Sequence, residues 1–366
     1  MKILVTGSNG FIGKNLKYFL LEKKYEILEY NRHEIKKKLI DNLKKCDLII
    51  HLAGENRPKT KNLFKINNEG LTKEICKTLI KNKISKPIIF SSTIHINETN
   101  AYALSKKNCE KTLFDYKEKT KAQLSILRLP NIYGKWAKHN YNSVIATFCH
   151  NLSRNKKIKL SKDQKLVKFL YIDDLVEQIN KIIKKKIFQL YPKFNNTHKS
   201  TVKNVAHIIK NFTKNDKIKR LNNFKNLFEK NLYSTYVSYL PQSKFTHQYK
   251  SNLDIRGNFI EFIKSDYYGQ VSIFTIKPKH QRGGHYHHSK VETFLIIQGK
   301  AVIEFQNLRD NKSYIKNVSS KKLNLFRSIP GWVHSIRNNG KNSLICAVWA
   351  NEIFIKERSD TYTYKQ

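Results

Sequence analysis

The sequence predicts two domains of different class: a doubly wound parallel α/β sheet, followed by an all-β antiparallel barrel or jelly roll. The first observation is length, because 366 residues are enough for two domains. The second is that residues 1–130 alternate short apolar runs with longer amphipathic stretches, which is typical of βαβ units. The third is a change near residue 245, after which β-branched and aromatic runs are separated by Gly, Asn and Pro. We therefore predict domains at 1–245 and 246–366.

Short apolar runs in the first half predict buried strands, and the helical period predicts the helices between them. The expected strands are 3–5, 25–30, 47–52 and 87–90, and the expected helices are 11–21 and 63–80. In the second of these helices, Ile66, Leu71, Ile75 and Leu79 share one face. Residues 180–245 are Lys-rich and are expected to form helices with loops. In the second half the expected strands include 271–276, 293–297, 301–305 and 344–349.

Positive charge is abundant but evenly distributed. Lys and Arg number 70 against 28 Asp and Glu, which gives a formal net charge of +42. The lysines are spread along the whole chain, and no zinc finger, basic zipper or RNA-binding sheet signature is visible. We therefore interpret them as a solvated surface whose field attracts anionic substrates, and we expect no nucleic-acid partner. A Lys-rich nucleic-acid-binding protein is the alternative from another class.

Cysteine usage and hydropathy indicate the compartment. The five cysteines are an odd number at long spacings without a CxxC pair, so we expect free thiols in a reducing environment. Signal-peptide architecture is not visible at the N-terminus, and no run of 18 apolar residues occurs. We therefore expect a cytoplasmic protein without membrane insertion.

A glycine-rich turn follows the first expected strand. Gly7, Gly10 and Gly13 lie between that strand and the first helix, within thirteen residues of the start. Such a turn allows the backbone to approach a pyrophosphate, while the helix N-terminus offers N–H groups and a positive dipole. Phe11 and Ile12 open this helix. The pattern predicts a dinucleotide site, although its glycine spacing differs from GxGxxG.

The end of the second expected strand bears on which dinucleotide is bound. An NAD site usually has an acidic side chain there for the ribose 2′-hydroxyl, whereas this strand ends in Tyr30, Asn31 and Arg32. Arg32 suits a 2′-phosphate, so we favour NADPH as the cofactor. Glu29 keeps NADH open, and Arg32 as an ordinary surface residue is the other alternative.

A Tyr and a Lys stand four residues apart after the fourth expected strand. Tyr102 and Lys106 share a helix face at this spacing. A nearby ammonium lowers the pKa of a phenol and can hold the nicotinamide ribose, so Tyr102 can deliver a proton to a carbonyl oxygen as hydride arrives at carbon. The run Ser91-Ser92-Thr93 closes the preceding strand with hydroxyls that can bind the same oxygen.

Together these pieces resemble an extended short-chain dehydrogenase/reductase over residues 1–180. Besides the motifs above, the matching stretches are residues 51–54 (HLAG), 128–134 (RLPNIYG) and 171–174 (YIDD). The resemblance implies that Thr93 acts with Tyr102 and Lys106. It also implies that Leu52, Ala53 and Gly54 join the cofactor site, and that the substrate is a nucleotide sugar. Ile94-His95-Ile96 departs from the family's Val-Tyr-Gly, so the local substrate contacts stay open.

A second constellation lies in the barrel half. His285 and His287 alternate along one expected strand, Glu292 is expected on the neighbouring strand, and His334 comes from a distant one. Three imidazoles and a carboxylate suit Zn²⁺ or another divalent first-row metal. The set, with Gly299 and Asn338 in register, resembles the two cupin motifs. Two departures are Lys279 at an expected Gly position and Pro330 directly before Gly331. A metal-free cluster that binds only substrate is the alternative.

The two sites suit consecutive steps on one 4-keto sugar. A ketone at C4 makes the C3 hydrogen acidic, so a barrel can invert C3 before a reductase fixes the stereochemistry by hydride transfer to C4. Over essentially its whole length the chain resembles the bifunctional capsular polysaccharide biosynthesis enzymes of the UDP-N-acetyl-L-fucosamine pathway. Stretches that carry this match are 134–136, 140–148, 232–241 and 349–352.

That resemblance implies a UDP-linked 4-keto-6-deoxy-HexNAc substrate and a homodimer. It implies C3 epimerisation by the cupin half and reduction at C4 by the first half. The residue that removes the C3 proton does not follow from spacing, because Tyr286, His287, His288 and Lys290 are all near. The alternative function is an NAD(P)-dependent sugar-nucleotide reductase/epimerase whose cupin only binds sugar.

Overall fold

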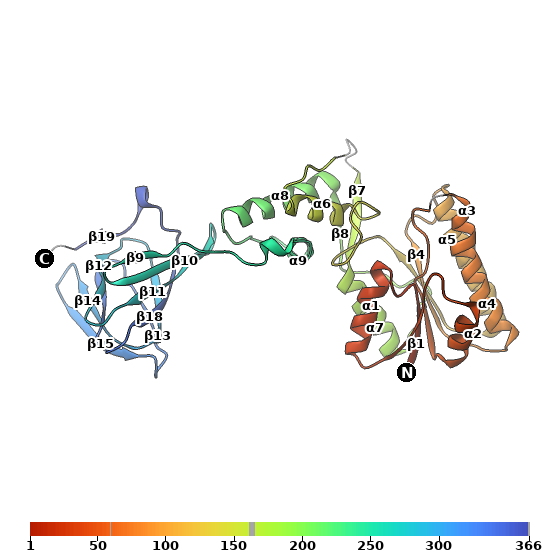
Figure 1. The fold of residues 1–366 in the computed structure, drawn as a ribbon, viewed down its shortest axis with the longest axis horizontal. Helices are drawn as coiled ribbons and strands as arrows, with labels where there is room; N and C mark the ends of the chain where they lie inside the picture. Colours follow the sequence, from red (N-terminus) through yellow and green to blue (C-terminus); the bar gives the residue numbers. More distant parts are fainter. Residues whose placement is uncertain (59, 161–164, 365–366) are drawn as a thin grey trace. The chain divides into compact units, whose positions relative to one another are not determined.

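The computed structural model describes residues 1–58, 60–160 and 165–364, and the chain divides into two compact units (Figure 1). The first unit comprises residues 1–210 and 226–242. The second comprises residues 211–225 and those from 243 onward. The segment 211–225 thus belongs to the second unit although it precedes residues 226–242 of the first.

A five-stranded parallel sheet in the order β2-β1-β3-β4-β5 forms the centre of the first unit. Its strands are β1 (Lys2–Thr6), β2 (Glu26–Tyr30), β3 (Leu48–His51), β4 (Ile88–Thr93) and β5 (Leu124–Leu129). The predicted α/β class with a doubly wound parallel sheet is confirmed, and each of the four predicted strands is present with shifted ends. The chain order reverses between β1 and β3, which is the point where ligands bind in such sheets.

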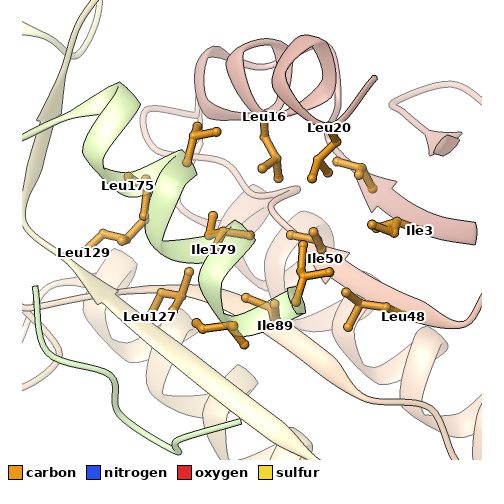
Figure 2. Packing of buried hydrophobic residues seen from close by; sticks show 14 of the residues in the cluster. Ile3, Leu16, Leu20, Leu48, Ile50, Ile89, Leu127, Leu129, Leu175 and Ile179 are labelled. Carbon is orange, nitrogen blue, oxygen red and sulfur yellow. The ribbon is translucent and has the colours of Figure 1, made fainter. Parts of the chain in front are cut away.

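Helices cover both faces of this sheet because its central strands are apolar on both sides. In β1, Ile3 and Val5 face one core and Leu4 faces the other, as strand alternation requires. The first core packs against α1 (Phe11–Glu22) and α7 (Ile172–Lys185), as Figure 2 shows for Leu16 and Ile179. The opposite core packs against three helices, α2 (Lys36–Lys45), α4 (Leu71–Lys81) and α5 (Ala101–Thr120).

The helix predicted at 63–80 contains an unexpected π-helical turn. It is built from α3 (Asn62–Phe64), the π-helix η1 (Lys65–Gly70) and then α4. A π turn inserts one residue and rotates the following face, so the predicted apolar stripe is interrupted. Ile75 and Leu79 are buried, whereas Ile66 is 56% exposed, so its predicted place on the buried face is wrong.

A smaller lobe completes the first unit, except that the end of α8 from residue 211 onward belongs to the second unit. A three-stranded sheet of order β6-β7-β8 lies with the remaining helices, and its β7 and β8 are antiparallel. These elements are β6 (Asn131–Tyr133), α6 (Val144–Ser153), β7 (Leu166–Tyr171), β8 (Thr197–Thr201), α8 (Val202–Lys217) and α9 (Leu227–Val237). Phe228 of α9 stacks against His198 with ring centroids 4.0 Å apart, which joins this helix to the small sheet.

The second unit consists of two antiparallel sheets packed face to face, which confirms the predicted all-β class (Figure 1). One sheet has the order β16-β13-β18-β11-β10-β9 and the other β15-β14-β17-β12-β19. A continuous core between them includes Phe274, Phe294, Ile303 and Ile336. The strands are β9 (Asn252–Asp254), β10 (Gly257–Ser265), β11 (Gly269–Ile276), β12 (Gln281–Tyr286), β13 (Glu292–Gln298), β14 (Lys300–Asn307), β15 (Ser313–Ser319), β16 (Leu325–Arg327), β17 (Trp332–Asn338), β18 (Leu344–Ala350) and β19 (Tyr362–Thr363); short 3₁₀ turns are η2 (Gln242–Lys244) and η3 (Lys356–Arg358).

Two further expectations concern the chain as a whole. All five cysteines are buried, free thiols, as their number and spacing predicted. Among the helices that the structure describes, none combines the length and the apolar character that a membrane crossing requires.

Candidate active sites

The chain turns tightly between β1 and α1, beside the end of β3. Gly7 has a φ of +74°, and its N–H donates to the Tyr30 carbonyl at 2.8 Å. A Cβ at Gly7 would lie 2.8 Å from the Ala53 backbone, and a Cβ at Gly13 would lie 2.1 Å from the Gly7 carbonyl oxygen. Both positions therefore need glycine, because a side chain would force the two loops or the helix apart.

Hydrogen bonds tie this turn to the loop after β3. The buried His51 ring contacts the hydroxyls of Thr6 at 2.7 Å and Thr72 at 3.0 Å, and Thr6 Oγ1 also accepts from the Ala53 N–H at 3.2 Å. The two loops flank the switch point of the sheet. The structure thus brings the predicted cofactor residues of both loops to one edge: Gly7, Gly10, Phe11, Ile12, Gly13, Leu52, Ala53 and Gly54.

The start of α1 is suited to an anion. No side chain caps it, and its first turn carries no acidic residue. Its amide N–H groups and dipole are therefore available to a phosphate. Together with the glycine turn that a Cβ would fill, this fits the pyrophosphate of a dinucleotide.

Side chains at the end of β2 are already engaged with one another. Glu29 accepts from the Ser8 hydroxyl at 2.6 Å and pairs with the Lys17 ammonium at 2.6 Å. Burial by itself raises the pKa of Glu29, but these contacts with Lys17 and Ser8 bring the pKa below its usual value. A ribose hydroxyl would have to compete with both contacts for this carboxylate.

Arg32 pairs with a carboxylate that sequence reasoning missed. Its guanidinium contacts Glu55, the residue after Gly54, and its side chain is 63% exposed. The backbone N–H of Glu55 donates to Asn68 Oδ1 at 2.6 Å, so the π-helical turn holds this residue in place. Its place in the sequence could have indicated a role in the site, because Glu55 follows the third strand at the ligand-binding edge of the sheet.

Tyr102 and Lys106 stand one turn apart on α5, against β4. Lys106 is 4% exposed; its Nζ donates to the Ser91 carbonyl at 2.8 Å and lies 4.7 Å from the Phe90 ring centroid. Burial lowers the pKa of Lys106 to about 8. A Cβ at Gly54 would lie 3.2 Å from this ammonium, so Lys106 borders the cofactor loop.

The other two predicted catalytic side chains are those of Tyr102 and Thr93. Burial, with a smaller contribution from Cys109, raises the pKa of Tyr102 to about 12, so the phenol keeps its proton at neutral pH. Thr93 ends β4, is 4% exposed, and its Oγ1 accepts from the His95 N–H at 3.1 Å. A phenol that keeps its proton can donate it to a carbonyl oxygen.

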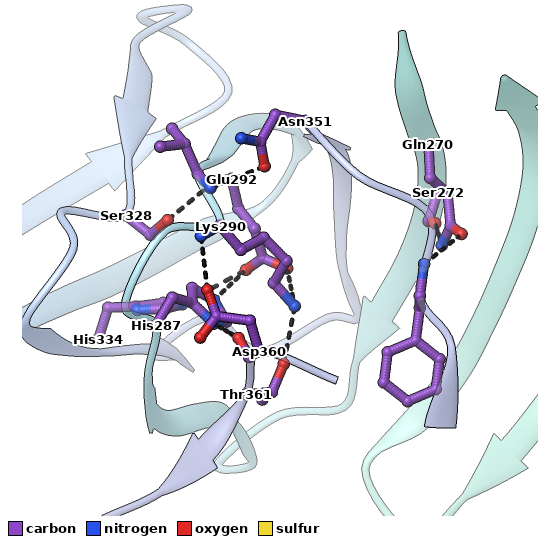
Figure 3. A network of polar contacts seen from close by, with 12 residues as sticks. Gln270, Ser272, His287, Lys290, Glu292, Ser328, His334, Asn351, Asp360 and Thr361 are labelled. Carbon is purple, nitrogen blue, oxygen red and sulfur yellow. Dashed lines mark hydrogen bonds and ion pairs between the residues drawn. The ribbon is translucent and has the colours of Figure 1, made fainter. Parts of the chain in front are cut away.

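In the second unit, His285, His287, Glu292 and His334 offer donor atoms that all lie within 4.8 Å of one another. Glu292 Oε2 lies 3.4 Å from Nε2 of both His287 and His334 (Figure 3). Burial, followed by the neighbouring His334, lowers the pKa of His285 to about 4, so this ring is neutral and carries a lone pair. Three buried ring nitrogens, His287 Nε2 and both of His334, have no hydrogen-bond partner among the described residues. Buried imidazole nitrogens without hydrogen-bond partners, gathered around a carboxylate, are suitable ligands for a divalent metal.

Pairing of the strands corrects one prediction. Glu292 does not lie on the strand beside His285, because β12 pairs with β17 and β19, whereas Glu292 begins β13 in the opposite sheet. The loop after His287 crosses between the sheets and so brings the carboxylate across. His334, distant in sequence, is paired directly with His285 in the register of β12 and β17.

The two departures from the cupin motifs have simple backbone explanations. Lys279, which replaces an expected Gly, has a φ of +66° and therefore adopts the left-handed conformation that Gly would supply. Gly331, directly after Pro330, has a φ of +75°, and a Cβ there would meet open space. Both positions thus have a positive φ, at Lys279 as well as at Gly331.

A cavity of about 350 Å³ opens beside the His/Glu cluster. Polar groups on its wall include Glu261, Gln270, Arg282, Lys290 and Glu292, and apolar contacts come from side chains such as Phe259 and Phe354. A hollow that combines polar groups with apolar surface can hold a polar small molecule and fix its orientation. Since Glu292 lines both the cavity and the cluster, a bound molecule would meet the cluster through this residue.

Comparison with known proteins defines the class. The description "NAD dependent epimerase/dehydratase family" matches residues 3–195, and "Polysaccharide biosynthesis C-terminal domain" matches residues 252–362. The chain belongs to the NAD-dependent epimerase/dehydratase family, and it is an enzyme that uses a nicotinamide cofactor.

Two similar proteins span essentially the whole chain, and a third shares the fold of one part. The chain is 36% identical to UDP-2-acetamido-2,6-beta-L-arabino-hexul-4-ose reductase of Pseudomonas aeruginosa, over 99% of this chain and 98% of that protein. It is 37% identical to the crystal structure of the capsular polysaccharide assembling protein CapF from Staphylococcus aureus, which covers 100% of both chains with a TM-score of 0.92. UDP-N-acetylglucosamine 4-epimerase from Bacillus cereus shares the fold over 65% of this chain, at 22% identity and a TM-score of 0.54.

We predict that Gly13→Ala removes dinucleotide binding, because the new methyl group would lie 2.1 Å from the Gly7 carbonyl oxygen. We expect the dissociation constant, measured by nicotinamide fluorescence, to rise at least about 100-fold, a loss of about 3 kcal/mol. The control is Gly70→Ala, whose Cβ would lie 3.7 Å from its nearest neighbour. Equal affinities of Gly13→Ala and the wild type would contradict the assignment of this turn.

Proposed function

We propose that this chain is a bifunctional sugar-nucleotide enzyme of capsule or O-antigen polysaccharide synthesis. The second unit, as a cupin, epimerises C3 of a UDP-2-acetamido-2,6-dideoxy-hexos-4-ulose. The first unit reduces the C4 ketone with NADPH, which gives UDP-N-acetyl-6-deoxy-L-talosamine. The observation that carries the proposal is the presence in one chain of two sites: a Tyr–Lys pair on α5 whose lysine borders the loop after β3, and a His/Glu cluster beside a cavity. Full-length similarity to a UDP-hexulose reductase and to CapF supports it.

The chemistry links the two steps through the C4 ketone. When C3 loses its proton to a base in the cavity, the C–H electron pair forms the C3–C4 double bond and the C4 oxygen becomes negative. Return of a proton to the opposite face of C3 restores the ketone with inverted configuration. Hydride delivered to C4 and a proton delivered to its oxygen then give the alcohol, after which C3 is no longer acidic.

Reduction uses three side chains of the first unit in this proposal. Tyr102, which keeps its proton, donates to the ketone oxygen, and the buried Thr93 hydroxyl orients that oxygen. Lys106 stabilises the phenolate that Tyr102 becomes and binds the nicotinamide ribose. When bound, NADPH supplies the hydride.

Selection of NADPH over NADH rests on Arg32. Its exposed guanidinium is placed after β2, where a 2′-phosphate would be read, and Glu29 is engaged with Ser8 and Lys17. Glu55 competes with the phosphate for Arg32. The NADPH preference is therefore expected to be moderate.

The metal proposed for the second unit is Zn²⁺ or another divalent ion. His285, His287, Glu292 and His334 would hold it, as supported by their proximity and their unpaired ring nitrogens. Such an ion would supply Lewis acidity next to the substrate's oxygens.

The proposal also includes an oligomeric state and a location in the cell. A homodimer follows from the resemblance to the capsular enzymes. A cytoplasmic location is favoured by the five buried free thiols.

We predict that Tyr102→Phe separates the two activities. NADPH oxidation with the 4-keto substrate should fall at least about 100-fold, because the proton donor to the ketone is lost. Deuterium incorporation at C3 in D₂O should stay at the wild-type rate, because exchange takes place in the other unit. Tyr18→Phe, at a 55% exposed tyrosine of the same unit, is the control. Loss of both activities in Tyr102→Phe would contradict separate sites.

Glu55→Gln is expected to sharpen the preference for NADPH. Removing the carboxylate frees the exposed Arg32 guanidinium. A charge pair with an exposed partner is worth up to about 1 kcal/mol, so the ratio of NADH to NADPH dissociation constants should rise roughly 2- to 5-fold. The control is Glu26→Gln, at the other end of β2, where Glu26 pairs with Lys2. An unchanged ratio would rule out competition between Glu55 and a 2′-phosphate.

His285→Ala should lower the metal content of the purified full-length protein, because one of four donors is removed. Elemental analysis measures the metal-to-protein ratio. His247→Ala, at an exposed histidine of the same unit, should keep the wild-type ratio. A wild-type ratio in His285→Ala would remove this residue from the ligand set.

A further inference from the structure

The segment that follows β18 returns to the His/Glu cluster. We call residues 356–364 the C-terminal strap. Within it, β19 pairs with β12, and Thr363 lies opposite His285 in the register. The Tyr364 N–H donates to the Gly284 carbonyl at 3.0 Å. The strap thus forms the edge of the sheet next to β12, the strand that carries His285.

One carboxylate of the strap organises the loop between His287 and Glu292. Asp360 accepts hydrogen bonds from three consecutive backbone N–H groups, those of His288 at 2.9 Å, Ser289 at 2.7 Å and Lys290 at 2.7 Å. The Ser289 hydroxyl adds a fourth bond at 2.9 Å. Hydrogen bonds to a charged acceptor are about twice as strong as neutral ones. Asp360 therefore fixes the loop that crosses between the two sheets.

Asp360 also orients the His287 ring. Nδ1 of His287 lies 2.6 Å from the Asp360 backbone carbonyl oxygen, which can only accept (Figure 3 shows both residues). In the neutral form of the ring, this contact places the proton on Nδ1 and leaves the lone pair on Nε2. His287 is 1% exposed, and its Nε2 lies 3.4 Å from Glu292 Oε2, so the lone pair is directed into the cluster. A backbone carbonyl behind a histidine is a common way to hold a metal ligand.

The next residue of the strap holds a buried ammonium at the cavity wall. Lys290 is 5% exposed, and its Nζ donates to Thr361 Oγ1 at 2.7 Å. The same Nζ lies 3.6 Å from Glu292 Oε1, and both Lys290 and Glu292 line the cavity. Figure 3 shows Lys290 between Glu292 and Thr361. The strap thereby aims one cation at the border between the cavity and the cluster.

Arg282 and Glu261, which also line the cavity, have separate partners. Arg282 contacts Asp254 through both terminal nitrogens and donates to the Thr275 and Gly257 carbonyls. Glu261 accepts from Lys264 at 2.7 Å and from Gln270 at 3.0 Å. Lys290 therefore stands out as a cation held beside the cluster by a single neutral hydroxyl and a carboxylate.

We propose that the C-terminal strap is a working part of the epimerisation site. Asp360 is a positioning residue that fixes the tautomer of His287 and the crossing loop. Thr361 is a positioning residue that places the Lys290 ammonium to donate a hydrogen bond to the oxygen that becomes negative when C3 loses its proton. The inference rests on the proposed function of the second unit.

Two substitutions separate these roles in the full-length protein. Asp360→Asn keeps the shape of the side chain but replaces one acceptor oxygen with an NH₂ group, which cannot accept a hydrogen bond from the backbone N–H groups. Thr361→Val keeps the shape and removes the acceptor for Lys290. The controls are Asp310→Asn, at an aspartate that accepts from the Lys312 N–H in a surface hairpin, and Thr246→Val at an exposed threonine.

Three quantities are measured for each variant. They are Co²⁺ affinity by visible absorption against a competing chelator, kcat and KM of C3 deuterium exchange, and the unfolding temperature. Asp360→Asn should bind Co²⁺ about 10- to 100-fold more weakly, the range seen when outer hydrogen bonds to metal ligands are removed. Thr361→Val should bind Co²⁺ within about twofold of the wild type while its kcat falls at least about tenfold with KM little changed, a loss of about 1.4 kcal/mol in transition-state stabilisation. Both controls should match the wild type.

The outcomes distinguish the strap from the proposed function. Wild-type Co²⁺ affinity in a folded Asp360→Asn variant, or wild-type exchange in Thr361→Val, would overturn the positioning roles while leaving the epimerase proposal in place. If Asp360→Asn does not fold, Thr361→Val alone decides the role of the strap. A wild-type protein that neither binds Co²⁺ nor exchanges C3 would overturn the proposed function and this inference with it.

Discussion

Both candidate sites depend on polar side chains that are buried. Lys106 and His287 are at most 4% exposed, and the ring nitrogens of His334 have no hydrogen-bond partner among the described residues. Burying such groups costs free energy, and unpaired ones cost about 1–3 kcal/mol each. The packed sheets on either side must supply that free energy. In return, the groups keep a fixed direction, which is what proton and hydride transfer need.

The two units meet this constraint with different architectures. In the first, parallel strands end at a common edge, so the glycine turn after β1, the loop after β3 and Thr93 at the end of β4 all gather there. In the second, the cluster draws on both sheets. His285 and His334 are paired across β12 and β17, Glu292 comes from β13, and the C-terminal strap fixes the loop between them. One site is thus set by strand order, and the other by a loop and a strap that join two sheets.

Much of this could be predicted from sequence where the signal is local. Gly7 and Gly13 are required by contacts within a few residues or with the adjacent loop, and Tyr102 and Lys106 follow from helical spacing. The π-helical turn could not be predicted, because Asn68 within it bonds the distant Glu55 backbone rather than its own helix. Glu55, Asp360 and Thr361 were missed for the same reason: each acts through a partner more than a dozen residues away. The strand assignment of Glu292 failed because spacing does not reveal that a loop crosses between sheets.

The central claim is that one chain performs two consecutive reactions on neighbouring carbons of one sugar. The most direct measurement is incubation of the full-length protein with the UDP-linked 4-keto-6-deoxy-HexNAc and NADPH in D₂O, followed by NMR of the product. The account predicts an alcohol at C4 with inverted configuration at C3 and deuterium on C3. A product reduced at C4 that keeps its original hydrogen and configuration at C3 would contradict it.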